Sequence, residues 1–304
     1  ILSHTVTKPL SQSMVLKSAI LTGCLVMVLA IFTPFSDAQV SQNNMIDEPH
    51  ENLIIESLSL ALYDRDGDVR EKAINTLGKI KTVRATQLLY DALESNDHDD
   101  QIKAAKLLLE RGETKALAPF IEHLKHENPK TRIWAAKSLR KIQSAETLTP
   151  LVNALDDPHP QVRKEVVRAI SELRTIKAIK PLSNALHDSS TDVREMAAWG
   201  LGEIENSATL PFLYKAIDDP EAEVRKAAIE SIGDLKDPRS AVYIHDKIND
   251  HNSGVREEAV NVLAEIHAPE SVPFLIQALR DEHHKVREDA AEALGTYRDP
   301  RAIV

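Results

Sequence analysis

The feature that most constrains the fold is a short phrase, Val-Arg-x-x-Ala or a close variant, that recurs at a fixed spacing of 31 residues. It is clearest at six valines, and every gap between them is a multiple of 31: Val69, Val162, Val193, Val224, Val255 and Val286. A fixed period of roughly 20–50 residues is typical of repeat proteins, in which each unit buries its apolar face on its neighbours. The sequence therefore predicts a solenoid. The repeats specify a shape and a surface, but they do not identify a binding partner.

Each repeat contains two helical patterns. The second begins at Val-Arg, and apolar residues follow the valine at positions 4, 5, 8 and 11, which is the spacing of one helix face. In the fifth repeat these residues are Val193, Ala197, Ala198, Leu201 and Ile204. Aromatic residues make up only 4% of the chain and there are 9 glycines, which argues against a β-rich fold. We predict an all-α fold of stacked helix pairs.

The turn between the two helices is acidic. An aspartate lies six residues before the arginine in most repeats, as in Asp157 before Arg163. The third repeat has His126 before Arg132, and the second is degenerate, with Ser95, Asp100 and Gln101 in place of Asp, Val and Arg.

These repeats resemble HEAT repeats of the PBS lyase (bilin-lyase-like) class over residues 52–304, or about eight helix pairs. The resemblance implies a right-handed α-solenoid in which the turn aspartate and the helix arginine form a hydrogen-bonded ladder. A partly buried arginine needs a paired carboxylate, so we expect these residues to be structural. They are Asp64, Arg70, Asp157, Arg163, Asp188, Arg194, Asp219, Arg225, Asp250, Arg256, Asp281 and Arg287.

The N-terminal segment resembles a secretory signal. An apolar run at 18–32 follows Lys17, and small residues precede a cleavage site after Ala38. We expect residues 1–38 to be an upstream extension and signal peptide, and 39–51 a disordered lead-in. The mature protein would then be secreted or periplasmic and, without Cys24, would have no thiol. The alternative is an uncleaved anchor formed by residues 18–32. We also expect the array to be truncated at its C-terminus, since residues 299–304 open another first helix.

The variable positions of the second helices carry the functional hypothesis. Positions 3, 6 and 10 after the valine point away from the apolar face, and we expect them to line a concave binding surface. The charged residues there are mainly basic in the first four repeats and all acidic in the last four. Trp134, Met196 and Trp199 lie near the crossover, and exposed Trp and Met are enriched where proteins bind. The predicted contact residues are Trp134, Met196, Trp199, Lys103, Lys106, Lys137, Lys141, Glu230, Asp234, Glu258 and Glu292.

Several kinds of chemistry find no support in the sequence. The formal net charge of −10 disfavours binding of nucleic acid over a broad face. Deoxyhypusine hydroxylases hold di-iron through His-Glu pairs in repeats of this kind, but the equivalent pairs here are Glu195-Met196, Glu257-Glu258 and Glu288-Asp289. Histidines near aspartates, such as His98, His159 and His251, have no regular metal-ligand spacing. We therefore expect no cofactor, no metal and no small-molecule substrate.

We predict a non-catalytic scaffold that binds a partner protein or peptide on its concave face. Two alternatives stay open: a bilin-lyase-type enzyme subunit and a membrane-tethered envelope assembly factor. Contact with a membrane is expected only if the N-terminal apolar segment is retained.

Overall fold

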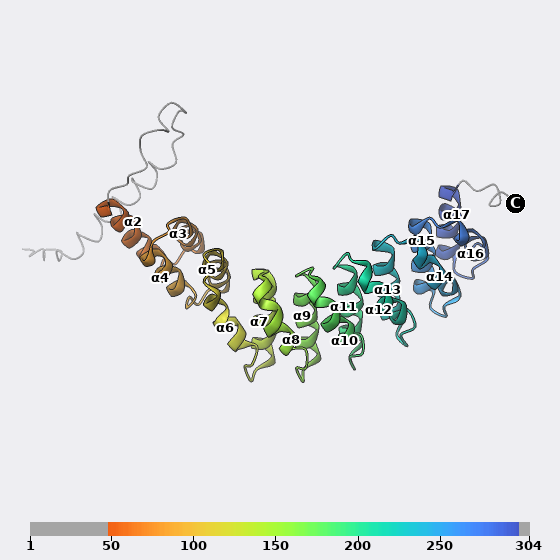
Figure 1. The fold of residues 1–304 in the computed structure, drawn as a ribbon, viewed down its shortest axis with the longest axis horizontal. Coiled ribbons are helices and arrows are strands. Elements are labelled where there is room, and N and C mark those ends of the chain that lie inside the picture. Colours follow the sequence, from red (N-terminus) through yellow and green to blue (C-terminus); the bar gives the residue numbers. More distant parts are fainter. Residues whose placement is uncertain (1–47, 298–304) are drawn as a thin grey trace, which may run out of the picture. The chain divides into compact units, whose positions relative to one another are not determined.

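The computed structural model describes residues 48–297, and this part of the chain contains only helices and their connections (Figure 1). The prediction of an all-α solenoid is confirmed. The first helices of the repeats are α2 (Glu48–Ala61), α4 (Val83–Ala92), α6 (Ala118–His123), α8 (Leu148–Asn153), α10 (Ile179–Ala185), α12 (Leu210–Ala216), α14 (Ala241–Ile244) and α16 (Val272–Ala278). The second helices are α3 (Gly67–Lys79), α5 (His98–Glu110), α7 (Pro129–Ile142), α9 (Pro160–Ser171), α11 (Thr191–Gly202), α13 (Ala222–Asp234), α15 (Ser253–Ile266) and α17 (His284–Tyr297).

From the third repeat onward, a 3₁₀ turn precedes each first helix. These turns are η1 (Thr114–Leu117), η2 (Ala145–Thr147), η3 (Ile176–Ala178), η4 (Ser207–Thr209), η5 (Pro238–Ser240) and η7 (Pro269–Ser271), and η6 (His245–Asn249) follows α14. Pro211 and Pro273 lie at the starts of α12 and α16, where the missing N–H costs least.

The described chain divides into two compact units, with the boundary between Asp100 and Gln101. We call residues 48–100 the N-terminal unit and residues 101–297 the C-terminal unit. One expected boundary was wrong: residues 48–51, assigned to a disordered lead-in, form the first turn of α2. The predicted signal segment, its cleavage site and the expected end of the array lie outside the described residues. No helix in the described part is long and apolar enough to cross a membrane.

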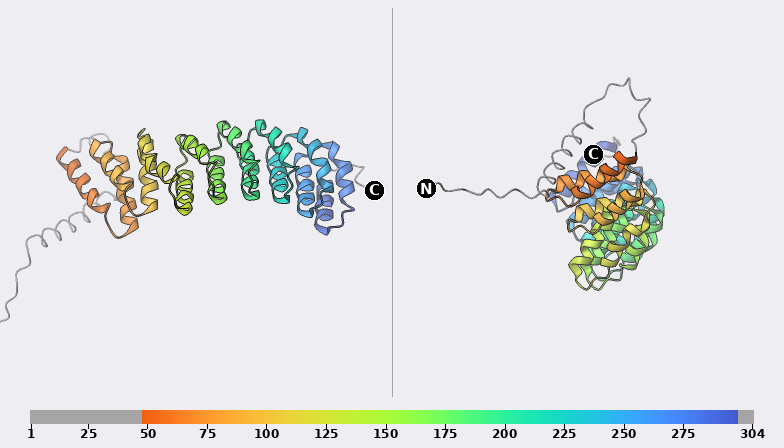
Figure 2. Two further views of the ribbon diagram at one scale, coloured as in Figure 1. Left: turned by 90° about the horizontal axis from the view of Figure 1, so that it is seen from below. Right: turned by 90° about the vertical axis from the view of Figure 1, so that its left-hand side faces the viewer.

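The C-terminal unit is a stack of helix pairs. Figure 1 shows α7, α9, α11 and α13 along one side and α8, α10 and α12 along the other, and Figure 2 shows the pairs in sequence. Neighbouring second helices pack directly on one another, from α7 on α9 to α15 on α17. The apolar positions of the repeat form the core: Val193, Ala197, Ala198 and Leu201 are buried in α11.

Asparagine and aspartate cap several second helices. Asp66, Asn128 and Asn252 each precede a helix and accept a hydrogen bond from a backbone N–H of its first turn. This satisfies donors that have no partner within the helix.

The other end of most second helices has a recurring backbone conformation. The residue there adopts a left-handed φ in six successive repeats: Gly112 (81°), Gln143 (56°), Arg174 (46°), Glu205 (53°), Lys236 (49°) and His267 (55°). These positions are 31 residues apart. Only one is a glycine, the residue that adopts this conformation without strain, so the sequence pattern alone gave no sign of the turn.

Candidate functional site

Apart from Arg287, each arginine of the ladder connects two repeats. Arg225 on α13 donates from Nε and Nη2 to the two carboxylate oxygens of Asp250 in the next turn, at 2.8 and 2.7 Å. Its Nη1 donates to the carbonyls of Asp219 and Pro220 in its own turn, at 2.8 and 3.0 Å. A planar guanidinium is suited to this two-sided arrangement because its donors form a rigid fork.

The same arrangement recurs through the C-terminal unit, and we call each one a rung. The carboxylate always comes from the turn 25 residues after the arginine. The other rungs are Arg132–Asp157 (Nε–Oδ2 2.6 Å), Arg163–Asp188 (2.7 Å), Arg194–Asp219 (2.8 Å) and Arg256–Asp281 (2.7 Å).

The rungs hold both partners in their charged forms. Burial alone raises the pKa of each rung carboxyl, but hydrogen bonds from the arginine and from a backbone N–H outweigh burial. The pKa of Asp157, Asp188, Asp219, Asp250 and Asp281 therefore lies below its usual value. The same hydrogen bonds raise the pKa of Arg132, Arg163, Arg194 and Arg256.

The rung of the N-terminal unit is built differently. Ser95 stands where other repeats have the turn aspartate, and Arg70 instead bonds to Asp100 (Nε–Oδ2 2.5 Å) and Asp97 (Nη2–Oδ2 2.7 Å). Its Nη1 donates to the carbonyl of Asp64, whose carboxylate accepts a bond from the Asp66 N–H. The sequence identified Ser95 and Asp100 as irregular but did not reveal that Asp100 replaces the missing carboxylate.

At the last described repeat, Arg287 donates to the carbonyls of Asp281 and Glu282 at 2.7 and 2.9 Å. It has no carboxylate partner among residues 48–297, and its side chain is exposed. This arginine therefore provides a natural comparison for the buried rungs.

The three residues predicted to anchor a partner differ in their surroundings. Trp134 packs on two rings of the preceding helix α6. Its ring centroid lies 5.7 Å from that of Phe120 and 5.2 Å from that of His123. Met196 and Trp199 lie one turn apart on α11, and both are half-buried. Trp199 makes no ring contact within the described residues. Part of the Trp134 ring is therefore used for packing within its own repeat, whereas the Trp199 ring makes fewer such contacts.

The backbone around Trp199 is tightly packed. A Cβ atom on Gly200 would lie 1.9 Å from Oγ of Ser171 on α9, and one on Gly202 would lie 2.7 Å from Ser231 on α13. Ser231 Oγ also donates to the carbonyl of Ala198 at 3.1 Å. Small residues therefore let α9, α11 and α13 approach closely, which fixes the position of Trp199.

Several charges expected to face a partner are paired between neighbouring second helices. Lys137 lies 3.9 Å from Glu165, and Lys226 lies 3.6 Å from Glu258. Lys226 was not among the predicted contact residues, because it falls outside positions 3, 6 and 10. Burial raises the pKa of the Glu258 carboxyl, and nearby Glu230 and Glu265 add to the effect.

Position 3 is less exposed than expected. Glu165 is only 6% exposed, and its Oε2 has no hydrogen-bond partner within the described chain. Asp289 is also buried and pairs with Lys285 at 2.9 Å. These two carboxylates therefore lie between helices and not on an open face.

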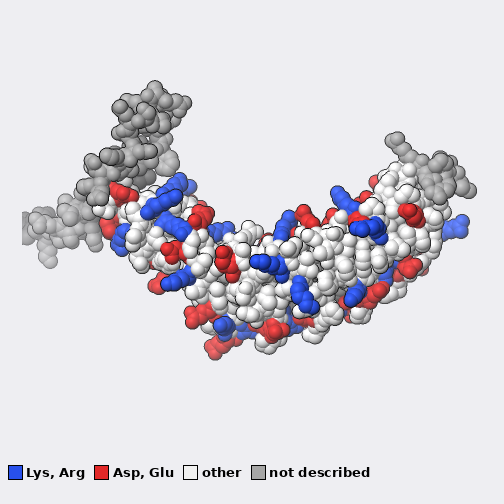
Figure 3. Space-filling model, in the orientation of Figure 1, with Lys and Arg blue, Asp and Glu red and all other residues white. Residues whose placement is uncertain are grey.

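Exposed acidic side chains remain on α13 and α17. Glu230, Asp234 and Glu292 are exposed and form no ion pair with any described residue. On the basic side, Lys106, Lys137 and Lys141 are exposed and Lys103 is half-buried. In the face of the C-terminal unit that Figure 3 shows, acidic and basic side chains are interspersed.

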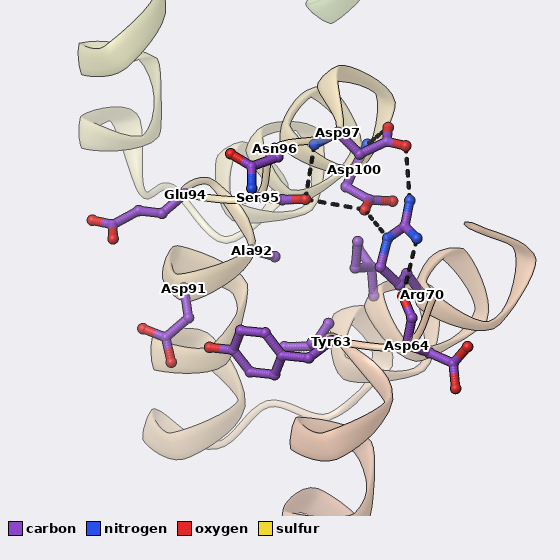
Figure 4. A pocket seen from close by; sticks show the side chains of 12 residues that line it. Tyr63, Asp64, Arg70, Asp91, Ala92, Glu94, Ser95, Asn96, Asp97 and Asp100 are labelled. Atoms are coloured by element: carbon purple, nitrogen blue, oxygen red, sulfur yellow. Dashed lines mark hydrogen bonds and ion pairs between the residues drawn. The ribbon is translucent and has the colours of Figure 1, made fainter. Parts of the chain in front are cut away.

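A pocket of about 600 Å³ lies in the N-terminal unit, beside the irregular rung (Figure 4). Leu62, Ile74 and Ala92 contribute apolar walls, and the Arg70 rung closes one side. Asp91, Glu94 and the ring of Tyr63 lie on the side away from Arg70. No pattern in the sequence predicted this pocket.

The described residues contain no group of three or more His, Cys, Asp or Glu side chains arranged to hold a metal ion. His159 and His251 are exposed in their turns. Glu195, Glu257 and Glu288, which stand where the resemblance to deoxyhypusine hydroxylases would place histidine, lie on three separate helices.

The chain is similar to several solved structures. An engineered protein is 20% identical over 80% of this chain and 78% of its own, with a TM-score of 0.43. Escherichia coli YibA is 20% identical over 85% of this chain and all of its own, with a TM-score of 0.45. Human deoxyhypusine hydroxylase, solved in complex with glycerol, is 19% identical over 82% of this chain and 99% of its own, with a TM-score of 0.36. These likenesses concern the fold, and no curated protein matches the chain.

The HEAT-repeat family matches residues 89–171, 117–190, 179–246 and 243–304, which together cover well over half of the chain. The PBS lyase HEAT-like repeat matches residues 69–95. With the paired helices and the recurring rungs, these matches show that the chain belongs to the HEAT-repeat family.

Proposed function

We propose that the protein is a non-catalytic scaffold that binds a segment of a partner protein on the inner face of its C-terminal unit. We define the inner face by positions 3, 6 and 10 of α7, α9, α11, α13, α15 and α17. HEAT-repeat solenoids provide long preformed surfaces of this kind.

The observation that carries the proposal is the placement of Trp199 and Met196. Both are half-buried on α11, whose backbone is held by close contacts with α9 and α13. A large side chain on a rigid backbone loses little freedom on binding, and tryptophan is enriched at the energetic centres of interfaces.

Charge would orient the partner on this face. Lys137 and Lys141 on α7 lie on one side of α11, and Glu230, Asp234 and Glu292 on α13 and α17 lie on the other. Complementary charge on a partner segment would speed its capture and select its direction. Glu258 contributes less because it is paired and partly buried.

The test places a photo-crosslinking residue at position 199 and, as a control, at position 243. Tyr243 is exposed on α14, a first helix. We expect native partners to be trapped from position 199 and not from 243. A Trp199→Ala variant should then bind the trapped partner at least tenfold more weakly, since interface anchors contribute about 2 kcal/mol or more. Unchanged affinity in a folded Trp199→Ala variant would contradict the proposal.

A second candidate function is a subunit of a bilin-lyase-type enzyme, favoured by the PBS lyase HEAT-like match at residues 69–95. A chromophore-transfer assay with a phycobiliprotein acceptor separates the two. Transfer would support the enzyme and contradict a purely non-catalytic scaffold.

We also propose that the chain is exported and cleaved after Ala38. The support is the apolar run at 18–32 behind Lys17, with small residues before the cleavage site. Sequencing the N-terminus of the mature protein tests this directly. A retained apolar segment would instead favour the membrane-tethered assembly factor.

A further inference from the structure

The last described repeat carries one half of a rung. Arg287 on α17 keeps its Nη1 on the carbonyls of Asp281 and Glu282, as the rung arginines do in their own turns, but its Nε and Nη2 bond to no described residue. In the complete rungs of the C-terminal unit, these two nitrogens hold the two carboxylate oxygens of an aspartate. The guanidinium of Arg287 is therefore held ready for a carboxylate that the described residues do not supply.

The first described repeat carries the other half. The Oδ1 atom of Asp64 accepts the N–H of Asp66 at 2.8 Å, and each rung aspartate of the C-terminal unit accepts the N–H two residues further on at 2.7–2.9 Å. The carbonyl of Asp64 accepts a hydrogen bond from Arg70, again as in the rungs. The Asp64 side chain is exposed, and its carboxylate pairs with no cation among the described residues. Asp64 is thus oriented like a rung aspartate that lacks its arginine.

Apolar positions are uncovered on the same two helix pairs. The valine that opens the second helix is at most 1% exposed at Val193 and Val224, but Val69 of the first repeat is 40% exposed. The position five residues after this valine is fully buried at Val260, whereas Ala291 on α17 is exposed. Inside a repeat array, the neighbouring repeat covers such positions. Val69 and Ala291 therefore lie on surfaces of the kind on which a further repeat packs.

A position of close helix approach is also open on α17. A Cβ atom on Gly233 of α13 would lie 2.8 Å from Val262 of α15, so this glycine lets the two helices come close together. Gly295 is the same position of α17, and a Cβ atom there would meet nothing within 4 Å. The position that Val262 occupies corresponds in the first repeat to Thr76, which is exposed. The last second helix thus has the small residue of a close contact, and the first has the exposed counterpart.

We propose that copies of this chain associate head to tail, with α17 of one copy packed on α3 of the next as neighbouring second helices pack within the chain. Arg287 of one copy then forms a rung with Asp64 of the other, and Gly295 faces Thr76. The contact uses a different surface at each end, so it does not close on a pair, and copies add in a line. This association goes beyond the proposed inner-face function and does not depend on it.

Sedimentation velocity on the protein as the cell produces it, from micromolar to nearly millimolar concentration, tests the proposal. We expect the average mass to rise with concentration and to pass that of a dimer, because the contact is open-ended. A monomer over the whole range, or a dimer that grows no further, would overturn the proposal.

Two variants each block one end. Arg287→Ala removes the guanidinium, and Asp64→Asn removes the carboxylate charge while leaving an oxygen for the N–H of Asp66. Each alone should associate at least tenfold more weakly, since truncating one partner of a buried charge pair at an interface is costly. Mixed together, they should form a one-to-one dimer, because the intact α3 end of the first variant meets the intact α17 end of the second. Wild-type association by either variant, or a mixture that stays monomeric, contradicts the head-to-tail contact.

A steric variant tests the close approach separately. Gly295→Leu places a side chain in open space within one chain, so the melting temperature should not fall, but it should block the approach of a second copy. The matched control is Lys215→Ala, which removes an exposed cation from α12 in the middle of the array and should associate like the wild type. Full association by a folded Gly295→Leu variant, or an equal loss in the control, would show that these faces do not form the contact.

Discussion

The rung of the N-terminal unit and the rungs of the C-terminal unit use the same arginine but obtain the carboxylate from different places. Arg163 and Arg225 bond to an aspartate at the start of the next turn, and the valine that opens the helix after that turn is buried. Arg70 bonds to Asp100, which occupies the valine's own position. The irregular rung keeps the charge pair and gives up the apolar packing.

The largest effect is expected when all rungs lose charge together. The rung aspartates have a lower pKa in the folded chain than the ordinary value of about 3.9. The stability that they contribute is therefore present above pH 4 and is lost as the pH falls through their folded pKa values.

Urea unfolding between pH 7 and pH 2, followed by circular dichroism, measures this. The free energy of unfolding should be nearly constant down to about pH 5 and then fall steeply. A stability that did not fall on acidification would show that the rungs contribute no charge-dependent stability.

The next largest effect is expected from removing one buried rung. Arg225 is only 4% exposed, and its removal leaves the Asp250 carboxylate buried without its partner. Arg225→Ala should lower the free energy of unfolding by about 3–5 kcal/mol. Arg287→Ala, which removes an exposed arginine bonded only to carbonyls, should cost below about 1 kcal/mol. Similar losses for the two variants in urea titrations would contradict a special role for the buried pair.

Restoring the regular arrangement at the irregular rung tests whether Asp100 takes the role that the turn aspartate has in the other repeats. Asp100→Val alone removes a partner of Arg70 and should cost about 1–3 kcal/mol. Adding Ser95→Asp returns the carboxylate to its regular place, and the valine takes the position that is buried in the regular repeats, so the double variant should recover that loss or exceed it. A double-mutant cycle in urea measures the coupling. If the changes in unfolding free energy of the two single variants simply add, Ser95→Asp does not compensate for the loss of Asp100.

The smallest effect concerns the left-handed turn, where the second repeat is again the exception. Gly112 adopts this conformation without strain, and a Cβ atom there would contact nothing within 4 Å. Gln143→Gly should raise stability and Gly112→Gln should lower it, each by about 1 kcal/mol, because a left-handed φ costs an ordinary residue about 1–2 kcal/mol. Thermal melts of the two variants should shift in opposite directions. Shifts of the same sign would show that side-chain contacts, and not backbone strain, decide the preference.

The period of the sequence predicted the helix pairs and the apolar core because both depend on residues that recur. It could not predict the ends of the second helices, since Gln143, Arg174 and Glu205 share a backbone conformation without sharing a side-chain type.

The candidate site was harder to predict for a related reason. Position 3 was expected to face outward, but the close approach of neighbouring helices buries Glu165 and Asp289 there. Lys226 and Lys285, which pair with carboxylates of the same face, fall outside the positions considered. The role of Asp100 depends on a contact with a residue 30 positions away, which a single sequence does not reveal.

The two-sided bonding of each arginine makes the regular repeats interchangeable. A 31-residue segment that begins at Asp157 carries one acceptor carboxylate for the repeat before it and one guanidinium, Arg163, for the repeat after it. Duplicating or deleting such a segment leaves every other rung with a partner. The second repeat lacks this property, because it accepts through Asp100 and carries Gln101 where the arginine would stand. An array of this kind can change its length by whole repeats anywhere among the regular ones, while the second repeat has a fixed place in the order.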